Sequence, residues 1–282
     1  MLQDLRQIRV ECFGEEETYL DFYFSQRFKP AHTLVYQEGK HTVASLTMLP
    51  CNIITPKQNI PASYIYAVAT LPSFQRRGIS NELLRHAESL LSTQEVSVAV
   101  LIPASASLFS FYAKQSFSTC FYRRKIIKKI EELPSVDVSE NIPELGIDGL
   151  WKLRNNYFMQ SKYYAQWDTE ALQYAKNECE LNGGKIIYAQ TDGVPFYAFC
   201  YPEKNSLVLK ETTAEEADLP ILVSQIKQHF PLVSVITFYT APHSRLFEGE
   251  GESLAFGMCK SLRGNATRPA MDALPYIGLV LD

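Results

Sequence analysis

The stretch that most constrains the fold lies between residues 64 and 91, where an apolar run is followed by an amphipathic segment. Tyr64–Ala69 is apolar throughout and indicates a buried strand. Over Gly78–Leu91 the apolar side chains recur at helical spacing, so we expect a helix with one buried face. The residues QRRGIS, from Gln75 to Ser80, lie in the turn between them. The sequence therefore predicts a strand, a basic turn and a helix in immediate succession.

This turn has the features of a phosphate-binding site. A helix N-terminus presents unpaired N–H groups and the positive end of the helix dipole. Gly78 lacks the Cβ that would keep an anion from the backbone, and Arg76 and Arg77 add positive charge. The simpler alternative is a plain strand–turn–helix with basic surface residues. Two other phosphate-binding loops are excluded, because neither GxxxxGK[ST] nor GxGxxG occurs in the chain.

A second motif follows another apolar strand, expected over Val96–Ile102. It reads FYAKQSF from Phe111 to Phe117 and falls partly in a short helix expected over Ser105–Gln115. Together the two motifs resemble the GNAT superfamily of acyl-CoA N-acyltransferases, whose pyrophosphate loop reads Q/R-x-x-G-x-G/A and whose later motif reads FYxKxGF. Three serines depart from the family pattern. Ser80 replaces the last glycine or alanine of the loop, Ser116 replaces the glycine of the second motif, and Ser105 stands where many members carry asparagine.

The resemblance implies acetyl-CoA as the cosubstrate and a set of residues that hold it. The loop would bind the pyrophosphate, and the strand end before it would pair its backbone with the pantetheine arm. Two residues at the start of the later helix would lie beside the same arm. The implied cofactor-binding residues are Val68, Ala69, Thr70, Gln75, Arg76, Arg77, Gly78, Ile79, Ser80, Asn81, Ser107 and Leu108. No metal is expected.

By the same resemblance, Tyr112 is the candidate general acid that protonates the departing CoA thiolate. A phenol can donate a proton or a hydrogen bond while it remains neutral near pH 7. The alternative is structural, because Tyr112 lies in the aromatic run LFSFY and such clusters usually belong to a core.

No general base is evident in the sequence. Many relatives carry a glutamate on the strand before the loop, but Ala62–Ala67 contains no carboxylate. Glu15, Glu16 and Glu17 lie near the expected acceptor loop, although solvated charges at a helix start explain them more simply. Asp282, with its terminal carboxylate, is a more remote candidate. A chain of water molecules is the default route for the amine proton.

The second half of the chain repeats the element order of the first half loosely. Two helices are expected over 151–162 and 169–181, then a hairpin, a strand, a helix over 214–230 and a strand. The whole chain resembles the Eis-type branch of the family, in which an active GNAT domain precedes a degenerate one. Those larger relatives also append a sterol-carrier-like domain, for which this chain ends too early. The expected fold is a mixed α/β tandem, with a cofactor-binding domain over 1–130, a linker over 131–149 and a GNAT-like domain over 150–282.

The second half has no counterpart of the basic turn. Its strand over 207–212 leads into TAEEAD, which contains no glycine and would repel a pyrophosphate. We therefore expect this half to shape the acceptor site rather than to bind CoA. An aromatic segment could supply one wall, although core packing is the simpler role for each residue: Tyr157, Tyr163, Tyr164 and Trp167. The acidic run Glu248–Glu252 could attract a cationic amine or simply be a solvated loop.

Composition narrows the functional classes. The 282 residues are 46% hydrophobic and 21% charged, as in a soluble globular protein. A net charge of −4 without a basic block argues against nucleic acid as a partner, and no apolar run is long enough to cross a bilayer. The six scattered cysteines favour buried thiols over disulfides or metal, and we expect a cytoplasmic protein.

Two classes of function remain open at this stage, and a third possibility keeps the enzyme but changes the acyl chain, because nothing in the loop indicates the chain length. The first is an N-acetyltransferase in which a primary amine, on a small molecule or a peptide, attacks acetyl-CoA directly within a ternary complex. The second is a non-catalytic protein that binds acetyl-CoA and senses it.

Overall fold

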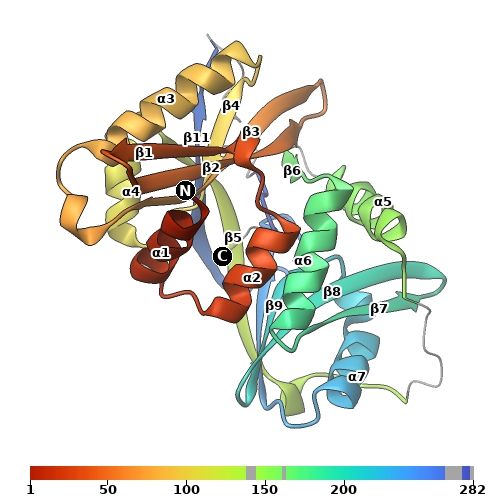
Figure 1. The fold of residues 1–282 in the computed structure, drawn as a ribbon. Coiled ribbons are helices and arrows are strands. Elements are labelled where there is room, and N and C mark those ends of the chain that lie inside the picture. Colours follow the sequence, from red (N-terminus) through yellow and green to blue (C-terminus); the bar gives the residue numbers. More distant parts are fainter. Residues whose placement is uncertain (138–143, 161–162, 264–274, 280–282) are drawn as a thin grey trace. The chain divides into compact units, whose positions relative to one another are not determined.

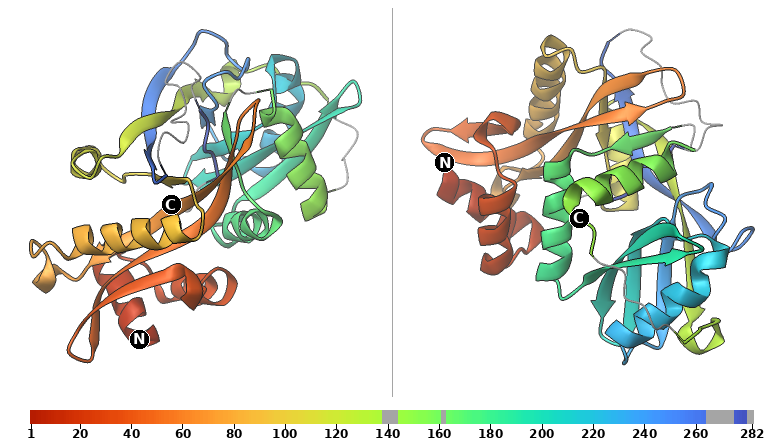
Figure 2. Two further views of the ribbon diagram at one scale, coloured as in Figure 1. Left: turned by 90° about the horizontal axis from the view of Figure 1, so that it is seen from above. Right: turned by 90° about the vertical axis from the view of Figure 1, so that its right-hand side faces the viewer.

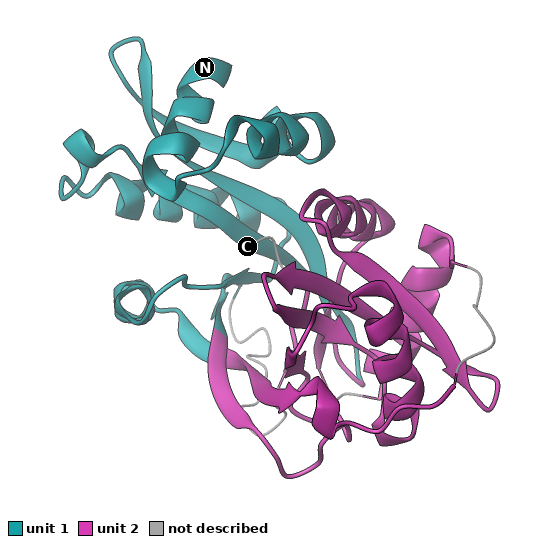
Figure 3. Ribbon diagram, turned by 90° about the horizontal axis from the view of Figure 1, so that it is seen from below, with its two compact units in different colours: residues 1–53, 57–119, 257–268 teal, residues 54–56, 120–256, 269–282 magenta. Residues whose placement is uncertain are grey.

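The structure, a computed structural model, describes residues 1–137, 144–160, 163–263 and 275–279. It divides into two compact units, shown in different colours in Figure 3. The first unit comprises Met1–Ile53, Lys57–Thr119 and Gly257–Arg268. The second comprises Ile54–Pro56, Cys120–Phe256 and Pro269–Asp282. The first unit therefore includes a segment from near the C-terminal end of the sequence.

The first unit is a mixed sheet with helices (Figure 1). Its helices are α1 (Leu2–Phe13), α2 (Glu17–Gln26), α3 (Ile79–Thr93) and α4 (Ala106–Ala113). Its strands are β1 (Thr33–Glu38), β2 (His41–Ile54), β3 (Asn59–Thr70), β4 (Val98–Leu101) and the end of β11 (Glu252–Ser261). They are ordered β1-β2-β3-β4-β11. β3 and β4 are parallel, whereas β1 with β2 and β4 with β11 are antiparallel.

The core of this unit forms under α3, as the helical spacing predicts. Ile79, Leu83, Leu84, Ala87 and Leu91 are buried on one face of the helix. They pack with apolar residues of β2, β3 and β4 and with Tyr112 and Phe117. Burial of such side chains stabilises the unit by about 1.5–3 kcal/mol for each large residue. This packing fixes the N-terminus of α3 at the end of β3.

The second unit has a closely related architecture. Its helices are α5 (Ile147–Phe158), α6 (Thr169–Leu181) and α7 (Leu219–His229). Its strands are β5 (Ser118–Lys129), β6 (Tyr164–Gln166), β7 (Lys185–Thr191), β8 (Val194–Glu203), β9 (Ser206–Thr212) and β10 (Val235–Thr240). The part of β5 that belongs to this unit begins at Cys120. The main strands are ordered β7-β8-β9-β10-β5. α7 packs against β7, and α5 and α6 lie side by side (Figure 2).

The two units share one topology. In the first, α3 connects the parallel strands β3 and β4, and in the second α7 connects the parallel strands β9 and β10. The next strand is antiparallel in both cases, but it comes from elsewhere in the chain. β11 pairs with β4, and β5 pairs with β10. This correspondence is much more specific than the shared element order seen in the sequence.

Most expected elements are present. Gly14 ends α1 in the left-handed conformation, with a φ of 70°. α6 has the expected bounds, whereas α7 begins at Leu219, later than expected, after a short 3₁₀ turn over Glu216–Asp218. The sequence did not predict β5, β6 or β11. All six cysteines are free thiols, and all but Cys12 are buried. None of the described helices has the length and apolar character needed to cross a membrane.

Candidate functional site

A pocket with a volume of about 520 Å³ lies where β3 turns into α3. Seven of the residues implied by the GNAT resemblance line it: Thr70, Gln75, Arg76, Gly78, Ile79, Ser80 and Asn81. Phe74 and Phe111 complete the lining. The sequence reading missed these two phenylalanines as site residues, although Phe111 stands next to Tyr112 in the quoted motif. The fold therefore brings most of the loop residues together around one open cavity.

Hydrogen bonds tie the two ends of the turn to each other. The Gln75 side-chain amide donates to the Thr70 carbonyl oxygen at 3.0 Å. The hydroxyl groups of Thr70 and Ser80 are 2.9 Å apart. Ser80, one of the departures from the family pattern, thus connects the first turn of α3 to the end of β3. This contact fixes the distance between the strand and the helix N-terminus.

The turn is shaped to accept an anion. Gly78 has a φ of 83° and forms the N-cap of α3, and a Cβ built at this position would contact nothing within 4 Å. Arg76 also has a positive φ, of 63°. Left-handed residues in such turns direct backbone N–H groups into a concave surface. Together with the helix dipole, these groups favour a negatively charged ligand.

The two arginines of the turn have different surroundings. Arg77 donates to the Ser73 carbonyl oxygen at 3.1 Å, lies 4.9 Å from the centre of the Phe74 ring, and is 3.6 Å from Glu38. Arg76 is exposed, lines the pocket, and has no ion pair with any described residue. Of the two cations, Arg76 is therefore the one that is available to a ligand in the pocket.

The strand that leads to the pocket is irregular. The parallel register of β3 with β4 extends from Ala62 with Val98 to Tyr64 with Val100, while β3 itself continues to Thr70. Ala67 has a φ of 51°, an uncommon conformation for a residue other than glycine. Backbone strain of this kind is retained only where the surrounding structure enforces it. Val68 and Ala69 follow directly, with Val68 half-buried and Ala69 buried.

Tyr112 lies in α4 and is 7% exposed. Its ring packs against those of Phe111 and Phe117 in edge-to-face geometry, with centroids 5.1 and 5.9 Å apart. Burial raises the pKa of Tyr112 to about 12. Among the described residues none forms a hydrogen bond with its hydroxyl group. The side chain is thus a core aromatic residue that retains its proton, a combination that allows either role considered from the sequence.

The remaining predicted residues lie around this centre rather than in the pocket lining. Leu108 is half-buried and packs against the core under α3. Ser107 is exposed, and its hydroxyl is 3.0 Å from that of Ser105. Ser105 is the N-cap residue of α4, although its side chain forms no capping hydrogen bond.

The glutamates considered as bases are not alike. Glu16 is exposed, and Glu17 forms an ion pair with Arg6 on the surface. Glu15 instead accepts two hydrogen bonds from Arg9, each 2.6 Å long, and its side chain is only 15% exposed. The interpretation of Glu15 as a solvated helix-start charge does not describe this contact. Asp282 lies outside the described residues.

In the second unit the corresponding junction lies between β9 and α7. Its acidic side chains accept hydrogen bonds from backbone groups of the same unit. Glu215 and Asp218 form a capping box at the start of the 3₁₀ turn. Glu215 also accepts a hydrogen bond from the Arg245 backbone N–H at 3.1 Å, and Glu216 accepts one from that of Phe247 at 2.9 Å. The carboxylates at this helix start thus hold a loop of the same unit.

That loop is fastened from the other side as well. The Arg124 guanidinium donates to the carbonyl oxygens of Ser244, Leu246, Phe247 and Glu250 at 2.7–3.2 Å. Lys128 pairs with the Glu250 carboxylate at 2.6 Å. The acidic run Glu248–Glu252 is therefore tied to β5 at Glu250. Of the aromatic segment considered as a wall, Tyr164 and Trp167 are buried in the second unit.

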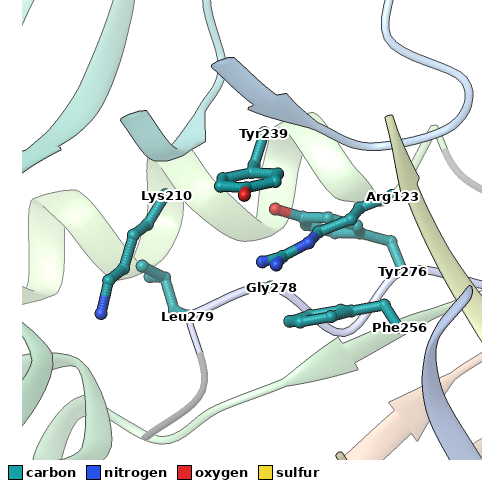
Figure 4. A pocket seen from close by; sticks show the side chains of 7 residues that line it. All are labelled: Arg123, Lys210, Tyr239, Phe256, Tyr276, Gly278 and Leu279. Carbon is teal, nitrogen blue, oxygen red and sulfur yellow. The ribbon is translucent and has the colours of Figure 1, made fainter. Parts of the chain in front are cut away.

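A smaller pocket in the second unit surrounds Arg123 (Figure 4). Its guanidinium lies between two aromatic rings, 3.7 Å from the centre of Tyr239 and 3.9 Å from that of Phe256. Tyr276 and Gly278 border it. Behind them Glu211 is fully buried and pairs with Arg154 at 3.0 Å. The two ring contacts of Arg123 are cation–π contacts, which stabilise the buried part of this side chain.

The first unit is thus an α/β domain with an open cavity at the turn from a strand into a helix. The sequence adds a family match for the first part of the chain. Residues 1–120 match the family model of an acetyltransferase (GNAT) domain. The resemblance noted from the two motifs is confirmed. No curated protein sequence matches the chain.

Solved structures share the fold over nearly the whole chain at low sequence identity. A probable N-acyltransferase from Enterococcus faecalis aligns with a TM-score of 0.71 and 14% identity over 93% of this chain and 70% of its own. A GCN5-related N-acetyltransferase from Kribbella flavida gives 0.72 and 16% over 92% and 68%. Eis1 from Mycobacterium abscessus gives 0.64 and 10% over 92% and 70%. The mixed α/β GNAT fold expected from the sequence is thus confirmed.

Proposed function

We propose that the protein is an N-acetyltransferase that transfers an acetyl group from acetyl-CoA to a primary amine by direct attack in a ternary complex. The observation that carries this proposal is the pocket at the turn from β3 to α3, in a domain that matches the GNAT family model. A GNAT domain implies an acyl-CoA cosubstrate. The open helix N-terminus and the exposed Arg76 suit its pyrophosphate.

In this proposal the irregular end of β3 holds the pantetheine arm. Because the register with β4 ends at Tyr64, backbone groups of Val68–Thr70 can form hydrogen bonds with the amides of the arm. The Tyr112 hydroxyl group then donates a hydrogen bond to the sulfur as the bond to the acetyl carbon breaks. A phenol with a pKa of about 12 is a weak acid toward a thiolate, whose conjugate acid titrates near 8.5. Hydrogen bonding to the developing charge is therefore its main contribution.

The pocket assignment is tested at Gly78 with a pair of variants. Gly78→Glu places a carboxylate where the phosphates approach, at a position whose backbone is in the left-handed conformation. We therefore expect CoA binding to be lost. Gly78→Ala adds only backbone strain of about 1–2 kcal/mol, and it should bind CoA measurably. Calorimetry on both folded variants measures the difference. Unchanged CoA affinity in Gly78→Glu would refute the assignment.

The second candidate function is an acetyl-CoA-binding protein without catalysis. The deep burial of Tyr112, which is compatible with a purely structural role, is the observation that favours it. Release of free CoA thiol distinguishes the two functions, because only an enzyme releases CoA when an amine is added. The assay uses a panel of small primary amines and of peptides with a free amino terminus, because the site does not identify the acceptor.

The second unit has a separate role in this proposal. It does not bind CoA, because Glu215 and Glu216 at the start of its helix hold the chain's own loop and would repel a phosphate. We propose that it shapes the acceptor site.

A further inference from the structure

Arg9, a residue that no motif singled out, is almost completely buried in the first unit. It lies on α1 and is 5% exposed. Its guanidinium donates to both carboxylate oxygens of Glu15 and, at 3.0 Å, to the Tyr66 hydroxyl. It also stacks over the Tyr23 ring, 3.8 Å from its centre. This cation thus contacts groups from α2 and β3 and from the turn between α1 and α2.

A buried ion pair of this kind is not the simplest way to stabilise a helix against a sheet. Removing two charges from water costs free energy that their attraction only partly returns, and apolar side chains of similar volume often stabilise as well. The same two helices are already joined on the surface by Arg6, which pairs with Glu17 and Asp21. The position of Arg9 therefore calls for an explanation other than attachment of α1 to α2.

The contacts of α1 bracket one short piece of β3. Arg9 contacts Tyr66, the residue immediately before the left-handed Ala67. One turn further along the helix, the Cys12 thiol lies 3.5 Å from the Thr70 carbonyl oxygen. The segment Tyr66–Thr70 is thus held at both of its ends by α1. This is the segment whose backbone faces the pantetheine arm in the proposed function.

We propose that Arg9 is a positioning residue for acyl transfer. Through Tyr66 it fixes the strained backbone of Ala67, and through Glu15 it couples that backbone to the turn between α1 and α2. This inference rests on the proposed function. The precise placement of Val68 and its neighbours sets the distance between the thioester and the attacking amine. Misplacement of reacting groups by about 1 Å can lower a rate on the order of a hundredfold.

The test compares Arg9→Met with Arg6→Met. Both remove one arginine from α1, but only the first reaches β3. We expect Arg9→Met to lower kcat on the order of ten- to a hundredfold while the Kd for CoA stays near the parent value. Arg6→Met should change neither. Rates are divided by the number of CoA-binding sites found by calorimetry, so that a loss of folded protein does not count as a loss of kcat.

Two further variants keep the test decisive if Arg9→Met folds poorly, because that variant leaves Glu15 without its partner. Tyr66→Phe removes one hydroxyl group and should lower kcat in the same direction by a smaller factor. Arg9→Lys, which keeps the charge but not the two-pronged geometry, should recover part of the rate. A kcat per binding site equal to the parent in both Arg9→Met and Tyr66→Phe would overturn the proposal.

A readout that needs no turnover separates this inference from the proposed function. Hydrogen exchange of the backbone amides of residues 66–70 should be faster in Arg9→Met than in Arg6→Met, while exchange in α3 should be equal. If the parent protein transfers no acetyl group to any amine, the proposed function fails, and the exchange measurement still decides whether Arg9 holds this segment. Equal exchange over residues 66–70 in both variants would overturn the inference itself.

Discussion

At the scale of single residues, Tyr112 combines a buried aromatic ring with a hydroxyl group that keeps its proton. It is packed between Phe111 and Phe117, and the same burial raises its pKa to about 12. Tyr112 can thus be part of the core and still hold the proton that its proposed catalytic role requires. We expect Tyr112→Phe to lower kcat on the order of a hundredfold, with little change in the Kd for acetyl-CoA, because only the hydroxyl group is lost. Turnover at the parent rate would mean that the hydroxyl is not used.

The raised pKa of Tyr112 also predicts how stability depends on pH. A tyrosine that titrates near 10 in the unfolded chain and near 12 in the folded one binds more protons when folded. Its contribution to stability is complete below pH 10 and is lost as the pH rises toward 12. Denaturant titrations over this range should therefore show a smaller decline for Tyr112→Phe than for the parent protein. An identical decline would contradict the assigned shift.

Arg76 and Arg77 are neighbours in sequence, yet their environments predict different effects on CoA affinity. Arg77 contacts Phe74, Ser73 and Glu38, whereas Arg76 lines the pocket. A hydrogen bond to a charged group contributes about 1.5–3 kcal/mol. We expect Arg76→Ala to weaken CoA binding by about tenfold or more and Arg77→Ala by less. Calorimetry at fixed ionic strength measures both, and equal losses would contradict the distinction.

At the scale of elements, most helices and the turn between β3 and α3 could be predicted, because their signals are local. The burial of Leu83, Leu84 and Ala87 follows directly from their spacing. β5 and β11 could not be predicted in the same way. β5 carries Arg123 and Arg124 in its middle, and their charges are accommodated by aromatic rings and loop carbonyls from distant segments. Those partners depend on the tertiary fold and leave no trace in the strand itself.

The end of α4 explains one departure from the family pattern and predicts its cost. The Phe117 N–H donates to the Tyr112 carbonyl at 3.1 Å and the Ser116 N–H to that of Ala113 at 3.0 Å, which together form a Schellman motif. Ser116 occupies the left-handed position of this motif, with a φ of 66°, where glycine is usual. A non-glycine residue in this conformation costs about 1–2 kcal/mol, partly offset by the greater freedom of unfolded glycine.

Ser116→Gly should therefore stabilise the protein by about 0.5–1 kcal/mol. The serine side chain is exposed, so its removal leaves no cavity. Urea denaturation measures the change, and Ser110→Gly, in the middle of α4, is a matched control that should destabilise by a similar amount. A loss of stability in Ser116→Gly would show that the motif is not strained.

At the scale of the whole molecule, each unit depends on a strand supplied by a distant part of the chain. β11 pairs with β4 from Met258 with Leu101 to Ser261 with Val98, and Met258 is buried in the core under α3. Lys260 also pairs with Glu88 of α3 at 2.7 Å. The sequence alone could not reveal this arrangement, because β4 and β11 are separated by about half the chain and neither carries a motif. The first unit, which carries the proposed cofactor pocket, is therefore not a continuous N-terminal segment.

Because β11 pairs with β4, the behaviour of a shortened chain without β11 can be predicted. A fragment that ends at Ser135 keeps every residue of the proposed cofactor pocket, but it leaves the edge of β4 unpaired and removes Met258 from the core. We expect it to bind CoA far more weakly than the full chain, with loss of cooperative unfolding. The same fragment followed by a flexible linker and residues 252–263 should regain binding, because it restores the missing strand. Calorimetry and thermal unfolding measure both proteins. Parent-like CoA affinity in the shorter fragment would show that β11 is dispensable, and acceptor assays could then be made on that fragment alone.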